Sequence, residues 1–552
     1  MLTAMLITAA AVWYSYYNST FTHLFLNDAM DYASIGRNIS RGDGFVSSYF
    51  TPLGLANREG LPHPDLWRAP LWPAVLALFI KVLGATDQAV AVAAGFFFIL
   101  GAGMTFLLGR ELFGRLVGFM SALVFVFSAQ NLINSVSGMT ETMAVFMMLL
   151  SIYLLVAPWV RSPWGDMLAG AALGLFYLTR YNALLFMPFL ALFTWYRSHG
   201  REGRATPWSN YNCDSKYSGL WAVVRYIAAF WLVISPWLIR NYLVMGSPMF
   251  SLQKFEPAMF TAAYPGYSMY MMLEKVDIGR FIMTHPQEIW SKIIAGWAEF
   301  RAGFFDPGMT GVSPYLFGLF LVSLIIPFGY GRKDSRGGKL YLTHAVRGGS
   351  RAVSGHKGVR PLLVACFVTQ LAALLAIHFI YRLFFIFMPL YIIFGVAALV
   401  WVLGILADRL PVKRDGFIGL FTVLLVGVFI ATNLPSWKPL KEGEMPIIGL
   451  RESVKAVTNM STRNELIISN DGHLLAWYGD RYAAKLPHRV DMIPEMEKLA
   501  PLKYIYLSSR MSWNIPEADR SWHQLYWGKP REIYGFKQVM VFPDGSVIYR
   551  KE

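Results

Sequence analysis

Two acidic residues lie where a hydrophobic stretch gives way to an amphipathic segment, and both could act on a substrate. Asp28 and Asp31 belong to the segment NDAMDYASIGRNISRGDGF, residues 27–45. Three residues apart on a helix, their side chains share one face and could present two carboxylates to one substrate or one metal ion. Carboxylates at a membrane boundary are costly to desolvate, so their presence there needs a reason. The alternative is helix capping, because Asn27 and Asp28 are residue types favoured at the start of a helix.

A third acid, Glu141, lies in SVSGMTETM and begins an apolar segment. Capping is again the alternative, since Thr140 directly precedes it. If Glu141 faces the same side of the membrane as Asp28, it becomes the second acid of one cavity. The candidate catalytic residues are therefore Asp28, Asp31 and Glu141.

Four arginines lie at predicted membrane boundaries, in WRAPLWP, LTRYN, PWLIRNY and HFIYRLFFIFMPLY. The positive-inside rule predicts few such residues on the outer side, so these arginines need anionic partners. The partners are either the acids named above or a phosphate group, whose oxygens a guanidinium binds bidentately. Snorkelling to lipid head groups is the alternative for any one of them. The candidate phosphate-binding or substrate-binding residues are Arg68, Arg180, Arg240, Asn241, His378, Tyr381 and Arg382.

A metal site is indicated only weakly. His63 and Asp65, in LPHPDLWRAP, could bind a divalent metal ion together with Asp28. Two or three ligands without a characteristic spacing are also what an ordinary loop contains. The sequence holds no Walker loop and no dinucleotide-binding fingerprint.

Composition places these residues in a membrane protein. Of the 552 residues, 55% are hydrophobic and 15% are charged, whereas a soluble domain carries about 25% charged residues. The net charge of +15 does not indicate a nucleic-acid partner, because the basic residues lie in short loops between apolar runs, as expected of cytoplasmic loops. With only Cys213 and Cys366, the chain has neither a disulfide framework nor a thiolate metal site.

Eleven apolar runs approach the roughly 20 residues that a membrane-spanning helix needs. Placing the basic loops inside predicts a cytoplasmic N-terminus and an extracytoplasmic C-terminus, in a plasma (inner) membrane. A further run at 71–84 is shorter, and we predict that it is re-entrant or interfacial. The predicted spans are 3–20, 89–109, 116–136, 143–160, 165–179, 183–196, 219–238, 314–330, 361–379, 383–403 and 416–434.

The predicted fold is an all-α polytopic membrane domain followed by a small α/β domain. The membrane domain covers residues 1–436 and has outer loops at 27–70 and 242–312, the second with an amphipathic stretch at 280–302. Residues 437–552 alternate charged and apolar positions and contain strand-like NELIISN and KYIYLSS. The segment VMVFPDGSVIYRKE, with Asp544-Gly545 at its centre, predicts a hairpin.

The order of the motifs resembles a known family. The run D-x-x-x-Y-x-x-x-x-R-N-I-x-x-G-x-G-F, with Asp28, Tyr32 and Arg37, is followed by R-A-P-L-W-P, G-R-E-L-F-G-R, T-E, L-T-R and P-W-x-x-R-N. This order is similar to the protein O-mannosyltransferase branch of the GT-C glycosyltransferases (family 39), which includes the bacterial aminoarabinose transferase that modifies lipid A. The resemblance covers roughly residues 1–400. The relatives' K-P-P or R-P-P reads R-A-P here, so Arg68 keeps the charge while one proline is lost.

The resemblance implies a GT-C fold and transfer of a sugar, with inversion, from a polyprenyl-phosphate donor to an extracytoplasmic acceptor. The acceptor is a lipid, a protein or a glycan. Asp28 would accept or orient the acceptor proton, and Glu141 would hold the acceptor or the sugar. Arg240 and Arg382 would stabilise the departing lipid phosphate. Metal dependence differs among family members, so a divalent metal cofactor stays open, as does the role of Asp31.

Two other functions remain alternatives at this point. The first is a transporter or flippase for an anionic lipid-linked substrate, although such proteins tend to show internal repeats and charges near the midplane of the bilayer. The second is an O-antigen ligase or polymerase, which would need a different set of arginines for a lipid diphosphate donor.

Overall fold

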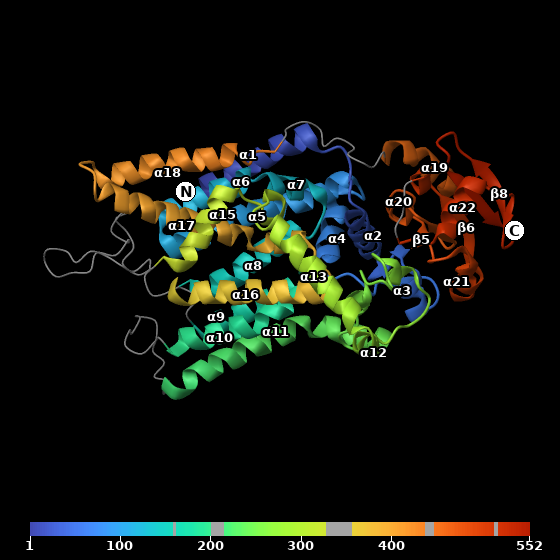
Figure 1. Cartoon of the computed structure of the whole chain (residues 1–552), viewed down its shortest axis with the longest axis horizontal. Helices are drawn as coiled ribbons and strands as arrows, with labels where there is room; N and C mark the ends of the chain where they lie inside the picture. Colours follow the sequence, from blue (N-terminus) through green and yellow to red (C-terminus); the bar gives the residue numbers. More distant parts are fainter. Residues whose placement is uncertain (158–161, 200–214, 327–355, 436–446, 513–516) are drawn as a thin grey trace.

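The computed structural model describes residues 1–157, 162–199, 215–326, 356–435, 447–512 and 517–552. Figure 1 shows an elongated bundle of helices with a β-sheet and its helices at one end, which we call the sheet end. The N-terminus lies toward the opposite end and the C-terminus lies in the sheet. The predicted boundary between two domains, at 436 and 437, falls outside the described residues.

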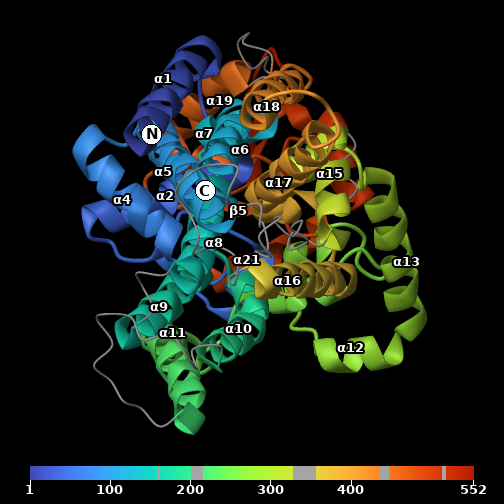
Figure 2. The ribbon, with the colours of Figure 1, turned by 90° about the vertical axis from the view of Figure 1, so that its left-hand side faces the viewer.

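All eleven predicted spans coincide with helices, although parts of 143–160 and 314–330 lie outside the described residues. Figure 2 looks along the bundle and shows α9, α10 and α11 projecting as a group from one side. The helices are α1 (Leu2–Thr20), α5 (Asp87–Phe113), α6 (Arg115–Phe127), α7 (Ala129–Ser137), α8 (Glu141–Val156), α9 (Pro163–Thr179), η2 (Tyr181–Phe186), α10 (Met187–His199), α11 (Ser215–Met245), α15 (Pro314–Ile325), α16 (His356–Ile377), η7 (Tyr381–Phe387), α17 (Met388–Ala407) and α18 (Arg414–Ala431).

The helices make the chain a multi-pass membrane protein. Among the described residues, five helices are long and apolar enough to cross a bilayer. A sixth is added if α6 and α7, bent by 61° at their junction, count as one span. The eleven crossings and their orientation stay a prediction.

Burial separates the central helices from the peripheral ones. The apolar span that contains α17 is 94% buried within the protein, whereas only 22% of α18 is buried. A helix that is apolar on all sides and fully covered is a core helix, and one that is equally apolar but uncovered faces lipid. The helical bundle is therefore built around α17, and α18 lies at its periphery, as fits a helix that faces lipid.

Two helices of the projecting group pack at the closest approach that backbones allow. A Cβ atom placed on Gly170 of α9 would lie 2.0 Å from the backbone oxygen of Tyr226 on α11. Without a hydrophobic driving force between helices in lipid, small residues that let backbones approach stabilise such pairs.

We predict that Gly170→Ala destabilises the protein by about 1–3 kcal/mol, because α9 and α11 must separate to admit the methyl group. The matched control is Gly318→Ala in α15, where an added Cβ meets no atom within 4 Å. Thermal unfolding in detergent should show a lower midpoint for Gly170→Ala than for the wild type, and no decrease for the control. Equal midpoints would contradict the close packing.

The first outer loop folds into short elements at the sheet end. They are α2 (Asn27–Arg41), β1 (Val46–Ser47), β2 (Tyr49–Phe50), α3 (Pro52–Asn57) and β3 (His63–Pro64), and α4 (Leu71–Leu83) follows the loop. At 1.5 Å per residue, the 13 residues of α4 extend about 20 Å, less than the roughly 30 Å of a hydrocarbon core. Whether 71–84 is re-entrant or interfacial stays a prediction.

The second outer loop forms η3 (Leu252–Ala258), η4 (Ser268–Met271), α12 (Ile278–Thr284), α13 (Pro286–Gly303) and α14 (Pro307–Thr310). The amphipathic stretch predicted at 280–302 corresponds to α12 and α13, which lie along one side of the bundle in Figure 2. Phe281 and Phe300 are buried, whereas Met283, Trp290 and Ile294 are exposed. This exposed apolar face fits a position against the membrane surface.

The sheet at the sheet end has seven strands in the order β2-β5-β4-β6-β9-β8-β7. The predicted strands and the hairpin around Asp544-Gly545 are present. The sheet also contains β2 of the first outer loop, which pairs in parallel with β5 and was not predicted. The remaining elements are α19 (Ile447–Met460), β4 (Leu466–Ser469), α20 (Gly472–Trp477), β5 (Tyr482–Lys485), η8 (Val490–Met492), α21 (Ile493–Leu499), β6 (Leu502–Leu507), η9 (Ser509–Ser512), α22 (Arg520–Gly528), β7 (Glu532–Ile533), β8 (Phe536–Val541) and β9 (Val547–Lys551).

Candidate active site

Helix α2 carries Asp28 and Asp31 in its first two turns and packs against α4. The approach is close: a Cβ atom on Gly36 would lie 2.9 Å from the Cβ of Leu76. No side chain caps the start of α2 or of α8, the helix that begins at Glu141. Capping hydrogen bonds therefore do not explain these acids, although Asp28 and Glu141 both lie in the first turn of their helices, where the helix dipole favours an acid.

A single arginine joins the two carboxylates of α2. Arg68 donates from Nη2 to Asp28 Oδ1 at 2.9 Å and from Nε to Asp31 Oδ2 at 2.6 Å. Its guanidinium lies over the rings of Tyr32 and Trp67, with its central carbon 4.7 and 4.4 Å from the ring centroids. The charge that Arg68 brings to the R-A-P motif is thus paired with acids within the protein. Only 7% of the Arg68 side chain is exposed.

The second oxygen of Asp28 binds another predicted arginine. Arg382 of η7 donates from Nη2 to Asp28 Oδ2 at 2.8 Å, and 47% of its side chain is exposed. Asp28 therefore lies between a buried and an accessible guanidinium, contributed by segments more than 300 residues apart in the sequence. This arrangement brings together Asp28, Asp31, Arg68 and Arg382, so these two arginines pair with the acids, one of the two kinds of partner that the sequence left open.

The two neighbouring acids differ in their protonation. Burial opposes the charge of Asp28, but Arg68 and Arg382 outweigh it and hold the pKa of Asp28 well below its usual range. Burial raises the pKa of Asp31 to about 7 against the pull of Arg68. Within the described structure, Asp31 Oδ1 is buried and has no hydrogen-bond partner, as fits a carboxyl that is not permanently ionised. Paired carboxyl groups whose environments separate their pKa values are typical of catalytic sites.

Glu141 forms a second ion pair. Arg180 donates from Nη2 to Glu141 Oε1 at 2.6 Å and from Nε to Thr140 Oγ1 at 2.8 Å. Both side chains are largely buried, and in the described structure Glu141 Oε2 and Arg180 Nη1 have no hydrogen-bond partner. Buried polar atoms without a partner are rare in proteins, and a bound ligand or an ordered water is one explanation for them.

Arg240 holds the first outer loop in place. It donates to the carbonyl oxygen of Asp65 at 2.8 Å and to Asn241 Oδ1 at 2.9 Å, and its guanidinium lies 4.8 Å from the Trp237 ring centroid. Asp65 in turn accepts hydrogen bonds from the backbone N–H groups of Trp67 and Arg68. Arg240 and Asn241 therefore support the loop that presents Arg68.

The residues proposed for a metal site do not come together. Among the described residues, no three His, Cys, Asp or Glu side chains form a group that could hold a metal ion. His63 stacks on Phe50, and burial lowers its pKa to about 4. Both of its ring nitrogens are buried without a hydrogen-bond partner in the described structure. The prediction of a site made of Asp28, His63 and Asp65 is wrong, because Asp28 is engaged by arginines and Asp65 by backbone N–H groups.

His378 and Tyr381 lie near the accessible side of the site. His378 Nε2 is 2.9 Å from the hydroxyl of Tyr267, and its ring stacks on Phe260 at a centroid distance of 3.8 Å. Phe260 has a φ angle of 59°, in the left-handed region that is strained for a bulky residue. Tyr381 is half exposed.

Two groups of residues beside the site were not predicted. Glu256 of η3 accepts a hydrogen bond from Tyr270 Oη at 2.8 Å, and burial raises its pKa to about 7. The ring of His473 in α20 contacts the ring of Tyr49 in β2, tilted by 32° at a centroid distance of 3.6 Å. Burial lowers the pKa of His473 to about 3, although the charge of Asp28 opposes this. The sheet therefore contributes to the surroundings of Asp28. No motif marks these positions in the sequence, since each lies in a segment without distinctive spacing.

Comparison with known proteins supports one class. A family model described as "Dolichyl-phosphate-mannose-protein mannosyltransferase" matches residues 63–209, the segment that contains Arg68, Glu141 and Arg180. The solved structure of ArnT from Cupriavidus metallidurans in the apo state is similar with a TM-score of 0.52 and 11% identity, covering 99% of this chain and 97% of that one. The solved structure of the Archaeoglobus fulgidus oligosaccharyltransferase in complex with Zn and sulfate is similar with a TM-score of 0.51 and 13% identity. That match covers 99% of this chain and 73% of the other. No curated protein sequence matches.

The chain thus has the fold of the GT-C glycosyltransferases. The resemblance to the branch that contains protein O-mannosyltransferases and the lipid A aminoarabinose transferase, predicted from the order of motifs, is confirmed.

The raised pKa of Glu256 predicts a dependence of stability on pH. From about pH 4.5 to about 7 the unfolded chain loses this proton while the folded protein keeps it, so the folded state becomes less stable as pH rises. The full loss is on the order of 3 kcal/mol. Unfolding midpoints at pH 5 and pH 8 should show that Glu256→Gln gains stability relative to the wild type at the higher pH. The control Glu495→Gln, at an exposed position, should show no such gain in stability. An equal change of the unfolding midpoint with pH in all three proteins would contradict a buried, protonated Glu256 carboxyl.

Proposed function

We propose that this protein transfers a sugar from a polyprenyl-phosphate donor to an acceptor at the sheet end, with inversion at the anomeric carbon. The observation that carries the proposal is the position of Asp28, whose carboxylate is shared by buried Arg68 and accessible Arg382. A base for the acceptor and a cation for the donor phosphate thus lie side by side. The family description, which names a dolichyl-phosphate sugar donor, supports the same substrate class.

Arg382 is the residue best placed to receive the donor phosphate. In the described structure its only ion pair is with Asp28 through Nη2, so Nη1 and Nε can donate to phosphate oxygens. Arg240 is occupied by backbone carbonyl oxygens, so we assign to it the support of the loop rather than contact with the phosphate. Exposed apolar residues of α13, among them Trp290 and Ile294, would guide the isoprenoid tail.

The proposed reaction is one displacement. A hydroxyl or amine of the acceptor attacks the anomeric carbon opposite the phosphate, and its proton passes to Asp28. The bond between the anomeric carbon and the phosphate oxygen breaks, and polyprenyl phosphate leaves with the electron pair. When Arg382 turns to the phosphate, one cation leaves Asp28, so the carboxylate becomes more basic at the moment it is needed. Glu141, with one oxygen unpaired, would hold the acceptor or the sugar.

The surroundings of this reaction follow from the same proposal. Residues 1–436 would form the membrane domain and 437–552 an extracytoplasmic domain, with the sheet end facing away from the cytoplasm of a plasma (inner) membrane. The donor, the acceptor and the membrane lipids are then the partners. The runner-up, a transporter for an anionic lipid-linked substrate, would move the donor without breaking its glycosidic bond.

We expect Asp28→Asn to lower sugar transfer at least 100-fold, because it removes general-base assistance while keeping the shape of the side chain. The assay uses purified protein in lipid with radiolabelled polyprenyl-phosphate sugars and measures both label in acceptor and free polyprenyl phosphate. Asp491→Asn, at an exposed position, is the control. A folded Asp28→Asn protein that transfers sugar at the normal rate would contradict the mechanism, and donor movement without cleavage would favour the transporter.

We expect Arg382→Gln to change the pH profile of transfer as well as its rate. Loss of this guanidinium weakens donor binding and leaves Asp28 with one cation fewer, so the pKa of Asp28 rises. The acid limb of kcat/KM should therefore move to higher pH. Arg409→Gln, an exposed arginine that follows α17, should leave the profile unchanged. A rate loss with an unmoved acid limb would mean that Arg382 does not act on Asp28.

A further inference from the structure

A cleft of about 530 Å³ opens on the other side of α2, away from the candidate active site. Its volume is within the range of small-molecule sites. It lies between the end of α2, the turn before α5, and the helices α19 and α20. Residues that line it include Arg37, Arg41, Ala85, Asp87, Lys455 and Trp477.

The cleft is separate from the site around Asp28. Arg37 follows Asp28 by nine residues, which at about 100° per residue is two and a half helical turns. The two side chains therefore leave α2 in opposite directions. A ligand in the cleft would contact the back of the helix that presents the carboxylates.

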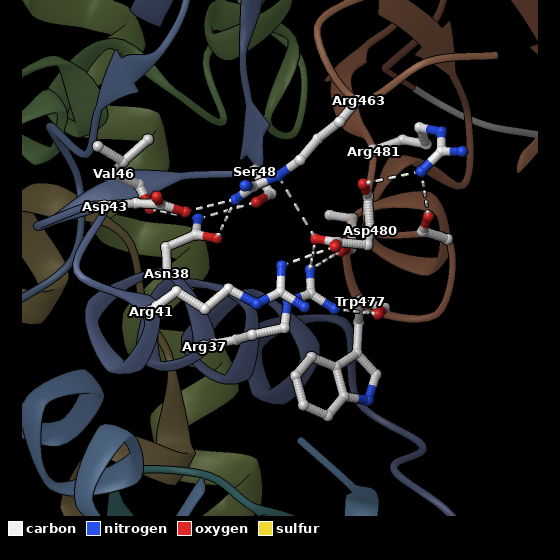
Figure 3. Close-up of polar contacts among 12 residues, drawn as sticks. Arg37, Asn38, Arg41, Asp43, Val46, Ser48, Arg463, Trp477, Asp480 and Arg481 are labelled. Atoms are coloured by element: carbon white, nitrogen blue, oxygen red, sulfur yellow. Dashed lines mark hydrogen bonds and ion pairs between the residues drawn. The ribbon is translucent and has the colours of Figure 1, made fainter. Parts of the chain in front are cut away.

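Figure 3 shows how arginines of α2 and of the sheet end converge beside this cleft. Arg37 Nη2 lies 3.0 Å from Asp480 Oδ1, and Arg41 Nη1 lies 2.6 Å from Asp480 Oδ2. Arg463 pairs with Asp43 at 2.6 Å and approaches Asp480 Oδ1 at 3.8 Å. Three guanidinium groups thus share two carboxylates, which fixes the arginines in place.

This cluster has more positive than negative charge. Arg481 donates to the carbonyl oxygens of Thr458 and Ser461, which neutralise none of its charge. Lys455 is exposed on the rim of the cleft and makes no ion pair within the part of the chain that the structure describes. Together with Asp87 of the cleft wall, the cluster contains five basic and three acidic residues. The basic residues are Arg37, Arg41, Lys455, Arg463 and Arg481, and the acidic ones are Asp43, Asp87 and Asp480.

One donor in the wall of the cleft is unsatisfied. The Arg37 side chain is 5% exposed, and in the described structure its Nε is buried without a hydrogen-bond partner. Its other nitrogens donate to the carbonyl oxygens of Ala476 and Trp477 at the end of α20. A buried N–H of a charged group left without an acceptor is costly, so the site favours a ligand with anionic oxygens.

The level of the cleft in the membrane indicates the source of such oxygens. The apolar span of α5 begins at Asp87, so the turn at Ala85 lies where the hydrocarbon ends and the head groups begin. Trp477 Nε1 and Tyr478 Oη donate hydrogen bonds to the carboxylate of Asp87 at 2.6 and 2.9 Å. Tryptophan and tyrosine are enriched at the interface between membrane and water. Arginine and lysine side chains at this level can bind the phosphate of an anionic lipid through charge-assisted hydrogen bonds.

We propose that this cleft binds the phosphate of an anionic phospholipid head group, with Arg37, Arg41 and Lys455 as its cationic wall. The site lies behind α2 and is independent of the proposed transfer reaction.

The test measures lipid retention by native mass spectrometry of the delipidated full-length protein, titrated with equimolar phosphatidylglycerol and phosphatidylcholine. The wild type should retain phosphatidylglycerol preferentially. Lys455→Glu reverses a charge that makes no ion pair with any described residue, and it should weaken this retention about fivefold or more. Ala85→Trp fills the cleft at an exposed position without changing any charge, and it should weaken retention as well. Lys498→Glu, at an exposed position of α21, is the matched charge control and should behave as the wild type.

Equal retention of both lipids by the wild type, or retention unchanged in both Lys455→Glu and Ala85→Trp, would overturn the proposal. A parallel titration with soluble glycerol 3-phosphate separates the two sources of phosphate. If the soluble compound binds the wild type and is lost in the variants while phosphatidylglycerol is not retained, the lipid assignment is wrong.

Discussion

The pairing of buried Arg68 with both carboxylates of α2 is the interaction on which the sheet end depends. A guanidinium and two acids removed from water are stable together only if their hydrogen bonds are nearly complete. Asp28 and Asp31 supply two of these bonds, and the rings of Tyr32 and Trp67 cover the faces of the cation. Removing any one partner would leave an uncompensated charge in a buried site, so the elements that carry the three residues are held to one geometry.

The irregular loop after α2 follows from this requirement. Arg68 reaches the acids only because Asp65 fixes the backbone before it and Arg240 fixes Asp65. The hydroxyl of Tyr181 adds a hydrogen bond to the carbonyl oxygen of Arg68 at 3.0 Å. The loop then enters the seven-stranded sheet through β2, so the sheet and the membrane helices are joined at the place where the carboxylates lie.

Local patterns in the sequence were sufficient for the helices and for the charged residues of the site, but not for their pairing. The predicted spans coincide with helical segments because apolar length is a local property, although 116–136 divides into α6 and α7. Asp28, Arg68 and Arg382 were recognised because charge is unusual at a membrane boundary. The partners of these charges depend on contacts between distant segments. Arg240 was expected at a phosphate and binds carbonyl oxygens instead, and the pairing of β2 with β5 joins residues more than 400 apart. Glu256 and His473 acquire their importance only from burial, which no short motif encodes.

The position of the sheet also bears on the chemistry. In a transfer reaction water competes with the acceptor for the activated sugar, so an active site of this kind benefits from walls that exclude water. In the proposed reaction Tyr49 and His473 would form such a wall: their aromatic rings contact each other at a centroid distance of 3.6 Å, and the charges of Asp28 and Arg68 act on both side chains. Because burial keeps the imidazole neutral, it adds no charge that would compete with Arg382 for a phosphate. The ion pairs of Asp480 with Arg37 and Arg41 hold α20 against α2, and they therefore keep this wall beside the carboxylate.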